Sequence, residues 1–350
     1  MIDQPTQTRA GEELNKEALA SYLRSHLSIA PEISIQQFPS GYSNLTYLIQ
    51  SGRDEFVLRR PPLGADIKSA HDMTREFQVL NSLRKAGYRK SPEPILLCED
   101  DFVMGAKFYL MRRVKGMILR NRVPKELKIE PAAFRALSTS AIDQLVHLHQ
   151  LDIFSSGLDQ LGKPEGYVQR QVEGWTKRYE NSQTDEIASL NETAIWMKNN
   201  LPGSSSVAFI HNDFKYDNLV LDPNDLTQVF AVLDWEMATV GDPLMDLGTT
   251  LAYWAEATDS DALKPFNLTW MPGNLTRKEV LDYYQRKSGR SIDNMIFYYA
   301  FGSFKVAVIC QQIYFRYKKG ISQDPRFASL IHVIKACGEN ARRAITNLKI

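Results

Sequence analysis

The chain has 350 residues, enough for two domains of ordinary size or for one two-lobed enzyme. With 43% hydrophobic and 24% charged residues the composition is that of a globular protein, and a formal net charge of +1 argues against general nucleic-acid binding. The first residues lack the apolar core of a secretory signal, and Lys305, Gln311 and Arg316 interrupt the most hydrophobic segment. We therefore expect a cytoplasmic protein with no nucleic-acid or membrane partner.

Cysteine usage agrees with this expectation. The three cysteines are odd in number, lie far apart and stand among apolar residues: Cys98, Cys310 and Cys337. This pattern predicts buried free thiols in a reducing compartment. No Cys/His cluster has the spacing of a metal site.

The first third of the chain is predicted to form a small sheet with one inserted helix. An amphipathic helix is expected at residues 14–23, and turn residues then separate stretches of alternating polarity. The predicted strands cover residues 33–38, 45–50, 55–60, 95–98 and 108–111, with a helix at 67–86.

From Pro131 onwards the pattern changes to helical periodicity. Short strand signals return at 207–210, 219–221 and 229–233, and the chain after Pro243 is predicted to be helical to its end. A β-rich front and a helical back predict an α+β fold of two lobes, with the N-terminal lobe at residues 1–113 and the C-terminal lobe at residues 114–350.

The clearest chemical signal is the polar segment that follows the apolar strand ending at Ile210. Asp213 and Asn218 lie five residues apart in this loop, and a second apolar strand begins immediately after Asn218. Phosphoryl transfer requires a carboxylate that orients or deprotonates the attacking hydroxyl, and an oxygen ligand for Mg²⁺ nearby. Asp213 and Asn218 could supply these two groups.

A second carboxylate follows the next apolar strand. Asp234 stands in AVLDWE, sixteen residues after Asn218. Mg²⁺ prefers one or two carboxylates together with phosphate oxygens, so Asn218 and Asp234 are the predicted metal ligands. Glu236, two residues further on, could support the metal site or be solvated.

Taken together, HNDFKYDN, VLDWE and GDPLMDLG resemble the aminoglycoside phosphotransferase and choline kinase family. More narrowly, they are similar to the phosphotransferase domains associated with acyl-CoA dehydrogenase-like proteins. The resemblance implies a bilobal protein-kinase-like fold, with an antiparallel-sheet N-lobe that binds nucleotide phosphates and a mostly helical C-lobe that holds the catalytic loop, metal site and acceptor. It further implies a small-molecule kinase that uses Mg-ATP and an alcohol acceptor, with Asp213 as a catalytic residue.

The same resemblance implies roles for the neighbours of Asp213. Lys215 would neutralise charge on the transferring phosphoryl group, although an exposed loop lysine is the alternative. His211 would hold the loop without transferring a proton, and Asp246 would anchor the loop from the following helix. The local sequence independently predicts Asp242, before a proline, as the N-cap of that helix.

In the front lobe, the turn after residue 38 takes the place of a glycine-rich loop. Backbone amides of this turn, which contains Gly41, and the hydroxyls of Ser40 and Ser43 could cradle phosphates, but a plain hairpin turn would look much the same. By resemblance, Arg59 takes the position of the phosphate-pairing lysine, where its guanidinium offers a bidentate fork. Glu76 is then its acidic partner, or else a solvated helix glutamate.

The segment that leaves the front lobe is predicted to contact the base. Backbone groups from Arg112 to Val114 would read the adenine edge, and the side chains leave GTP open as an alternative to ATP.

Acceptor specificity is predicted to lie in the helical back lobe. Residues 301–350 contain nine basic side chains against two acidic ones, which disfavours polycationic aminoglycosides and favours an anionic acceptor such as a hydroxyacyl-CoA or a hydroxy acid. A solvated basic surface is the simpler interpretation of most of them. Aromatic residues in the same region also leave an amino-alcohol, choline-like acceptor open.

The alternative from another class is a catalytically inactive nucleotide-binding module with the same fold. Inactive members lose the loop Asp, the Asn or the metal Asp, whereas all three are present here as Asp213, Asn218 and Asp234. The sequence does not determine the oligomeric state, nor whether a partner enzyme consumes the product.

Overall fold

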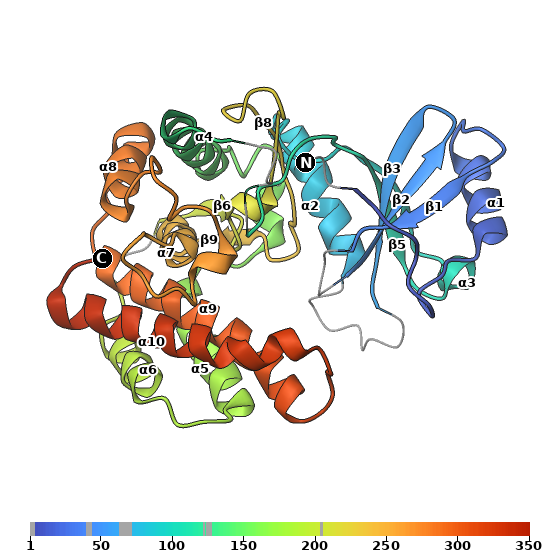
Figure 1. The fold of residues 1–350 in the computed structure, drawn as a ribbon. Helices are drawn as coiled ribbons and strands as arrows, with labels where there is room; N and C mark the ends of the chain where they lie inside the picture. The colour runs from blue at the N-terminus through green and yellow to red at the C-terminus, as the bar shows by residue number, and fades with distance from the viewer. Residues whose placement is uncertain (1–3, 40–43, 63–71, 122, 124–127, 204–205) are drawn as a thin grey trace. The chain divides into compact units, whose positions relative to one another are not determined.

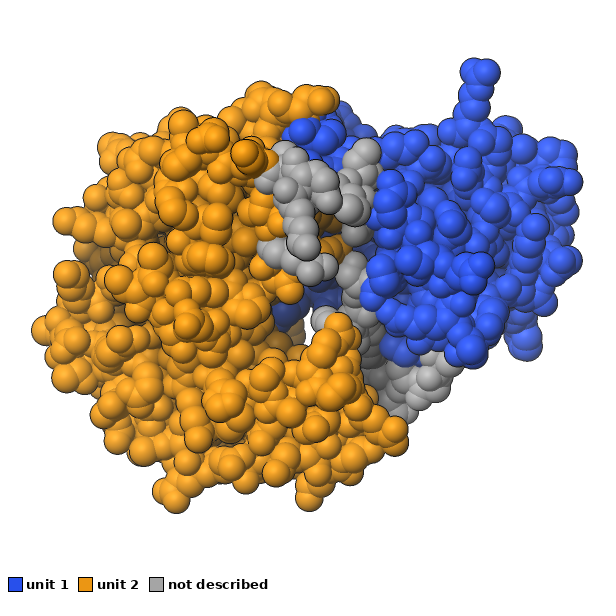
Figure 2. Space-filling model, in the orientation of Figure 1, with its two compact units in different colours: residues 1–117, 220–223, 230–237 blue, residues 118–219, 224–229, 238–350 orange. Residues whose placement is uncertain are grey.

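The structure is a computed structural model that describes residues 4–39, 44–62, 72–121, 123, 128–203 and 206–350 (Figure 1). The chain divides into two compact units, shown in different colours in Figure 2. Unit 1 contains residues 1–117, 220–223 and 230–237, and unit 2 contains residues 118–219, 224–229 and 238–350.

Unit 1 is built on an antiparallel sheet of five strands in the order β1-β2-β3-β5-β4 (Figure 1). The strands are β1 (Ser34–Gln37), β2 (Leu45–Ser51), β3 (Asp54–Arg60), β4 (Pro94–Cys98) and β5 (Phe108–Arg112). The helices are α1 (Lys16–His26), α2 (Met73–Lys85) and α3 (Asp101–Met104). The sequence missed α3, because its four residues are too few to display a helical period.

Alternation along the strands gives the sheet two different faces. Tyr47, Leu58 and Leu110 pack with Leu19 and Leu23 of α1 in one apolar cluster. Arg59 is the next residue after Leu58 and therefore points to the other face, where its partner Glu76 lies on α2. The strand period thus fixes which side of the sheet carries the charge.

Unit 2 is mainly helical, and β6 pairs antiparallel with β9 within it. Its helices are α4 (Pro131–His149), α5 (Tyr167–Ser182), α6 (Ala188–Asn199), α7 (Pro243–Tyr253), α8 (Arg277–Ser288), α9 (Met295–Lys318) and α10 (Leu330–Asn347). The strands of this unit are β6 (Ala208–Ile210) and β9 (Thr239–Gly241). Two further strands, β7 (Leu219–Leu221) and β8 (Val229–Val232), pair with each other and belong mostly to unit 1. Four 3₁₀ segments are η1 (Leu158–Leu161), η2 (Tyr216–Asn218), η3 (Lys264–Phe266) and η4 (Pro325–Ser329).

The predicted α+β organisation, with an antiparallel sheet in the front part of the chain and helices in the back part, is confirmed, but the prediction for one stretch is wrong. Residues 254–276 form an irregular loop around η3, although the chain after Pro243 was expected to be helical throughout. Pro265, Pro272 and Gly273 interrupt the helical pattern there, and Gly273 has φ 99°, a conformation that favours glycine. The strand β9 was also missed, because three residues carry no clear alternation.

Helix α9 forms the centre of unit 2. It is long and apolar enough to cross a membrane by length and composition, with a mean hydropathy of 1.2 over its most apolar window, yet 78% of that window is buried in the protein. It lies against α7 (Figure 1) at a contact between two glycines. A Cβ on Gly248 would collide with the carbonyl of Tyr298, and one on Gly302 with the carbonyl of Gly248. Backbones of α7 and α9 therefore touch directly.

Two local predictions are confirmed in the fold. Asp242 caps α7, because its Oδ1 accepts from the Leu244 N–H at 2.9 Å and Pro243 occupies the first turn. The three cysteines are free and buried.

Candidate active site

The loop between β6 and β7 gathers the predicted catalytic groups of unit 2. Lys215 Nζ lies 2.9 Å from Asp213 Oδ2, and Asn218 Nδ2 donates to the same carboxylate oxygen at 3.2 Å. Asn218 Nδ2 also donates to the Asp213 carbonyl at 2.8 Å, an orientation that leaves its Oδ1 available as a ligand. The sequence-predicted Asp213, Lys215 and Asn218 thus lie together.

The Asp213–Lys215 pair is strongly coupled. Burial by itself would raise the pKa of Asp213, but the charge and hydrogen bond of Lys215 outweigh burial and bring the pKa of the carboxyl below its usual value. Burial likewise opposes the charge of Lys215, and Asp213 raises the pKa of the amine well above normal. The Tyr253 ring, 4.8 Å from Lys215 Nζ, adds a cation–π contact. Both groups are therefore charged at neutral pH.

The backbone before Asp213 is held from α7. Asp246 accepts from the N–H of His211 at 2.7 Å and from the N–H of Asn212 at 2.8 Å. Asp213 in turn donates its N–H to His211 Nδ1 at 3.2 Å, so His211 supports the loop. Asn212 has φ 67°, a left-handed conformation that Asn adopts more readily than most non-glycine residues.

Asp246 is fully buried and is oriented by a histidine that the sequence did not single out. His149 of α4 contacts Asp246 through Nε2 at 3.1 Å and the Tyr284 hydroxyl through Nδ1 at 2.8 Å. Burial favours the neutral carboxyl of Asp246, but His149, His211 and the backbone N–H bonds overcome it and lower the pKa of the group. The anchor is thus an ionised carboxylate with every oxygen in use.

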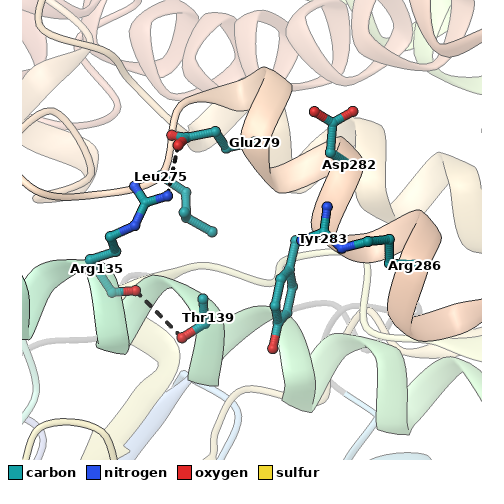
Figure 3. A pocket seen from close by; sticks show the side chains of 7 residues that line it. All are labelled: Arg135, Thr139, Leu275, Glu279, Asp282, Tyr283 and Arg286. Atoms are coloured by element: carbon teal, nitrogen blue, oxygen red, sulfur yellow. Dashed lines mark hydrogen bonds and ion pairs between the residues drawn. The ribbon is translucent and has the colours of Figure 1, made fainter.

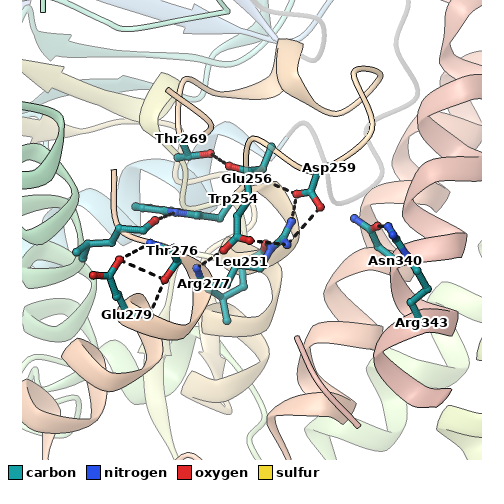
Figure 4. Close-up of polar contacts among 12 residues, drawn as sticks. Leu251, Trp254, Glu256, Asp259, Thr269, Thr276, Arg277, Glu279, Asn340 and Arg343 are labelled. Carbon is teal, nitrogen blue, oxygen red and sulfur yellow. Dashed lines mark hydrogen bonds and ion pairs between the residues drawn. The ribbon is translucent and has the colours of Figure 1, made fainter. Parts of the chain in front are cut away.

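The far end of the catalytic loop is held by the irregular segment 254–276. Asn267 accepts from the Tyr216 N–H at 3.1 Å and donates to the Tyr253 carbonyl at 3.0 Å. Figure 4 shows how this segment is fastened. Arg277 binds Asp259, and its N–H donates to Glu256 at 2.7 Å.

In unit 1, Arg59 is the centre of a second charged network. Arg59 lies 2.8 Å from Glu76, 3.4 Å from Asp234 and 3.4 Å from Glu236. Asn44 Nδ2 also donates to Glu236 at 2.9 Å. The pairing of Arg59 with Glu76 is the contact that the resemblance implies, while its role in nucleotide binding stays a prediction.

This second network has an excess of negative charge. Burial disfavours both the Arg59 cation and the Glu76 anion, but Glu76, Asp234 and Glu236 together hold the pKa of Arg59 well above normal. For Glu76, burial dominates and raises the pKa of its carboxyl despite Arg59. Arg59 Nε and Glu76 Oε2 are buried without a hydrogen-bond partner among the described residues. Arg59 is therefore a single cation paired with three carboxylates in a partly desolvated site.

Asp234 is the accessible member of this network, with its side chain 36% exposed. Its φ of 67° is again left-handed, which Asp tolerates better than most residues. The adjacent Trp235 is buried, donates Nε1–H to the Val232 carbonyl at 2.9 Å and meets the Tyr88 ring edge-on. This anchored tryptophan fixes the strained residue that carries the carboxylate.

The predicted metal ligands belong to different units, Asn218 to unit 2 and Asp234 to unit 1. Each offers an oxygen atom, as Mg²⁺ requires. Over the described part of the chain, no group of three His, Cys, Asp or Glu side chains could hold a metal ion. The assignment of Asn218 and Asp234 to Mg²⁺ stays a prediction.

Two further segments were predicted to bind the nucleotide, the turn after residue 38 and the segment from Arg112 to Val114. Ser40, Gly41 and Ser43 lie outside the described residues. At the segment after β5, the Arg112 N–H already donates to the Glu93 carbonyl at 2.8 Å, and the next N–H to the Glu55 carbonyl at 3.1 Å. The Val114 N–H has no acceptor among the residues described, so it is the amide that remains for a base.

A groove between α4 and α8 has a cavity volume of about 360 Å³ (Figure 3). Its lining is largely charged, with Arg135 paired to Glu279 at 2.8 Å. It contains none of the residues predicted for the site. The lining residues are Arg135, Thr139, Leu275, Glu279, Asp282, Tyr283 and Arg286.

The basic residues of the C-terminal segment are mostly solvated. Eight of the nine are exposed, and the ninth, Lys305, is 1% exposed. Two of the exposed ones pair with local acids, Arg326 with Asp324 and Arg342 with Glu339. The sequence analysis treated Lys305 as an interruption of an apolar segment and as one of these nine basic residues, and it did not connect this lysine with the loop that contains Asp213.

The comparison with protein families supports the resemblance. The phosphotransferase enzyme family matches residues 34–278. The chain is 36% identical over 316 residues to acyl-CoA dehydrogenase family member 11 of Gallus gallus, covering 89% of this chain and 40% of that protein. The Homo sapiens protein of the same name is 33% identical over 337 residues, covering 93% and 43%. The chain thus spans less than half the length of these curated relatives.

Solved structures agree in fold. A Ralstonia eutropha protein assigned by name to the aminoglycoside phosphotransferases has a TM-score of 0.81 at 28% identity, covering 96% of this chain and 99% of that one. Choline kinase from Cryptosporidium parvum gives 0.61 at 12% identity, covering 95% and 99%. The GDP complex of aminoglycoside 2'-phosphotransferase-IIIa gives 0.60 at 15%, covering 93% and 99%. The predicted resemblance is confirmed, and the chain belongs to the phosphotransferase enzyme family with a protein-kinase-like fold.

Proposed function

We propose that this chain is a small-molecule kinase that transfers the γ-phosphoryl group of Mg-ATP to an acceptor hydroxyl. The observation that carries the proposal is the Asp213 carboxylate, ionised and held beside Lys215 and Asn218 on a loop whose backbone is fixed by Asp246. Such a constellation positions groups and stabilises charge, and phosphoryl transfer asks little else of a protein.

In this mechanism Asp213 accepts a hydrogen bond from the acceptor hydroxyl and aims its oxygen at phosphorus. Because Lys215 lowers the pKa of Asp213, the carboxylate is a weak base, so it orients the hydroxyl first and receives the proton late. Lys215 then faces the charge that develops on the transferred group. Asn218 and Asp234 would hold Mg²⁺, which supplies neutralisation of charge on the phosphate oxygens.

The nucleotide end of the proposal rests on unit 1. Arg59, kept in place by Glu76, offers a fork of donors to phosphate oxygens, and the Val114 N–H is available to a base. The GDP complex of a structural relative supports nucleotide use in general. ATP is the proposed donor and GTP the alternative.

For the acceptor we propose an anionic molecule, a hydroxyacyl-CoA or a hydroxy acid. The relatives named as acyl-CoA dehydrogenase family members support this choice, because that name refers to an enzyme class that acts on acyl-CoA. The exposed basic residues of the C-terminal segment give weaker support. An aminoglycoside or choline-like acceptor is the alternative, which names of structural relatives favour.

The test is a screen of Mg-ATP consumption with hydroxyacyl-CoAs, hydroxy acids, amino alcohols, sugars and aminoglycosides, with phosphorylated product identified by mass spectrometry. Asp213→Asn should lower kcat by about 10²- to 10⁴-fold, the usual contribution of such a group. The matched control is Asp282→Asn, an exposed carboxylate of the α8 groove, which should keep full turnover.

The outcomes separate the alternatives. Turnover with aminoglycosides alone would overturn the anionic acceptor but keep the kinase. Nucleotide binding by calorimetry without turnover of any acceptor would favour an inactive nucleotide-binding module. Transfer that survives Asp213→Asn would overturn the mechanism.

A further inference from the structure

Lys305 is a buried cation that none of the roles above uses. It lies in the middle of α9 and is 1% exposed, while its Nζ donates to the Asn212 carbonyl at 2.6 Å. No carboxylate of the described residues lies within ion-pair distance of it. Burying a lysine without a carboxylate is costly, so its contact with the loop needs an explanation.

The partner of Lys305 is the residue that precedes Asp213. The N–H of Asn212 is taken by Asp246 of α7, and its carbonyl is taken by Lys305 of α9. Asn212 is therefore hydrogen-bonded through its N–H to an anion and through its carbonyl to a cation, and its φ is 67°. Asn adopts this left-handed conformation more readily than most non-glycine residues, and the two contacts hold Asn212 in it.

The helix packing explains how both groups reach one residue. Asp246 lies two residues before Gly248, and Lys305 lies three residues after Gly302. Because these two glycines bring the backbones of α7 and α9 into contact, the charged side chains project from neighbouring turns towards the same loop. Replacement of either glycine would separate α7 from α9 and so displace Asp246 or Lys305 from its hydrogen bond to Asn212.

We propose that Lys305 is a positioning residue for phosphoryl transfer, which holds the Asn212 carbonyl and thereby aims the Asp213 carboxylate. The inference rests on the proposed catalytic function of Asp213. Lys305 itself touches neither nucleotide nor acceptor in this proposal.

The surroundings of Lys305 give the contact a pH dependence. Asp213 and Lys215 face it from the loop, Asp246 from α7, and Arg178 from α5, where the Trp175 ring lies 5.6 Å from Nζ. Burial is the largest influence and, with Lys215 and Arg178, outweighs the two aspartates to lower the pKa of Lys305 to about 8. Above that pH Lys305 is a neutral amine and forms a weaker hydrogen bond to the Asn212 carbonyl, so kcat should fall.

Stability should move in the opposite direction over the same range. The pKa of this amine is lower in the folded than in the unfolded protein, so between about pH 8 and 10.5 the unfolded chain binds the extra proton. That titration therefore raises the free energy of unfolding as the pH rises. A loss of kcat above pH 8 without a loss of stability would distinguish positioning from unfolding.

The test compares Lys305→Met and Lys305→Arg with Lys198→Met, which changes an exposed lysine of α6 outside the basic C-terminal segment, using the acceptor found in the screen. Lys305→Met should lower kcat about 10- to 100-fold, leave the nucleotide KM within about twofold and remove the alkaline limb near pH 8. Lys305→Arg should restore part of kcat and extend activity to higher pH, because guanidinium stays charged. Lys198→Met should match the parent protein.

A second measurement is independent of turnover. Hydrogen exchange of the amides of residues 211–214 should accelerate at least about tenfold in Lys305→Met and remain unchanged in Lys198→Met. Unchanged exchange together with unchanged kcat would overturn the inference. If no acceptor turns over, the proposed function fails, and hydrogen exchange alone decides whether Lys305 holds the loop.

If Lys305→Met does not fold, the test uses Lys305→Arg and the pH profile of the parent protein. An alkaline limb of kcat that is unmoved by Lys305→Arg would then overturn the inference.

Discussion

Around Arg59 in unit 1, one cation is shared by Glu76, Asp234 and Glu236, whereas the loop network of unit 2 sets two cations against two carboxylates. The first set has an excess of negative charge, and among the described residues Arg59 Nε and Glu76 Oε2 have no hydrogen-bond partner. In the second, both oxygens of Asp246 are engaged and Asp213 pairs with Lys215. Charge balance therefore distinguishes a network with surplus negative charge from one whose charges offset each other and hold a backbone in place.

The largest effect is expected where the balanced network is broken. Asp246→Asn removes the charge that binds His211, Asn212 and His149, and should lower the free energy of unfolding by about 3 kcal/mol at pH 7. Chemical denaturation monitored by circular dichroism measures this value. An unchanged stability would mean that the network is not balanced by this carboxylate.

The pH dependence of this variant sharpens the prediction. Since the pKa of Asp246 is lower in the folded protein than in the unfolded chain, the stability it contributes is complete above the unfolded value of about 3.9. It is lost as the pH falls through the folded value. The difference between Asp246→Asn and the parent protein should therefore be constant at neutral pH and shrink below about pH 4.

A smaller effect is expected at the helix contact that supports the same network. Gly302→Ala forces a methyl group against the carbonyl of Gly248 and should cost about 2 kcal/mol, or a Tm lower by about 3 °C. The matched control is Gly174→Ala in α5, whose added methyl meets only the end of the Arg178 side chain and should keep or raise the Tm. Equal Tm values for the two variants would contradict direct backbone contact.

The smallest effect is expected in the network with excess charge. Arg59→Lys keeps one cation among the carboxylates but loses the fork, and should raise the nucleotide KM by about tenfold with little change in Tm. Steady-state kinetics with varied Mg-ATP tests this. A large drop in Tm would mean that unit 1 depends on the guanidinium for stability, as unit 2 depends on Asp246.

Local chemistry explains what the sequence could predict. The Asp242 cap and the gathering of Asp213, Lys215 and Asn218 each follow from a short motif with a fixed spacing, whereas the pairing of Arg59 with Glu76 was implied by the family resemblance. His149 and Lys305 escaped detection because their partners lie 97 and 93 residues away along the chain. Only tertiary packing brings them to the loop.

The irregular segment 254–276 shows the same limit from the other side. Its prolines and glycine are typical of a loop and could have predicted one. No pattern in the neighbouring sequence indicates that Asn267 accepts a hydrogen bond from the Tyr216 N–H. Helical periodicity before and after the segment concealed it. Composition over a long window is thus a poor guide where a loop is stabilised by side-chain hydrogen bonds to a distant backbone.

The contact between Gly248 and Gly302 restricts how this enzyme could be re-engineered. A side chain larger than glycine at this contact would push α9 away from α7, and Lys305 of α9 would move relative to the Asn212 carbonyl. The C-terminal turns of α9, beyond Gln311, lie outside this contact, so substitutions there are expected to leave the loop that contains Asp213 in place.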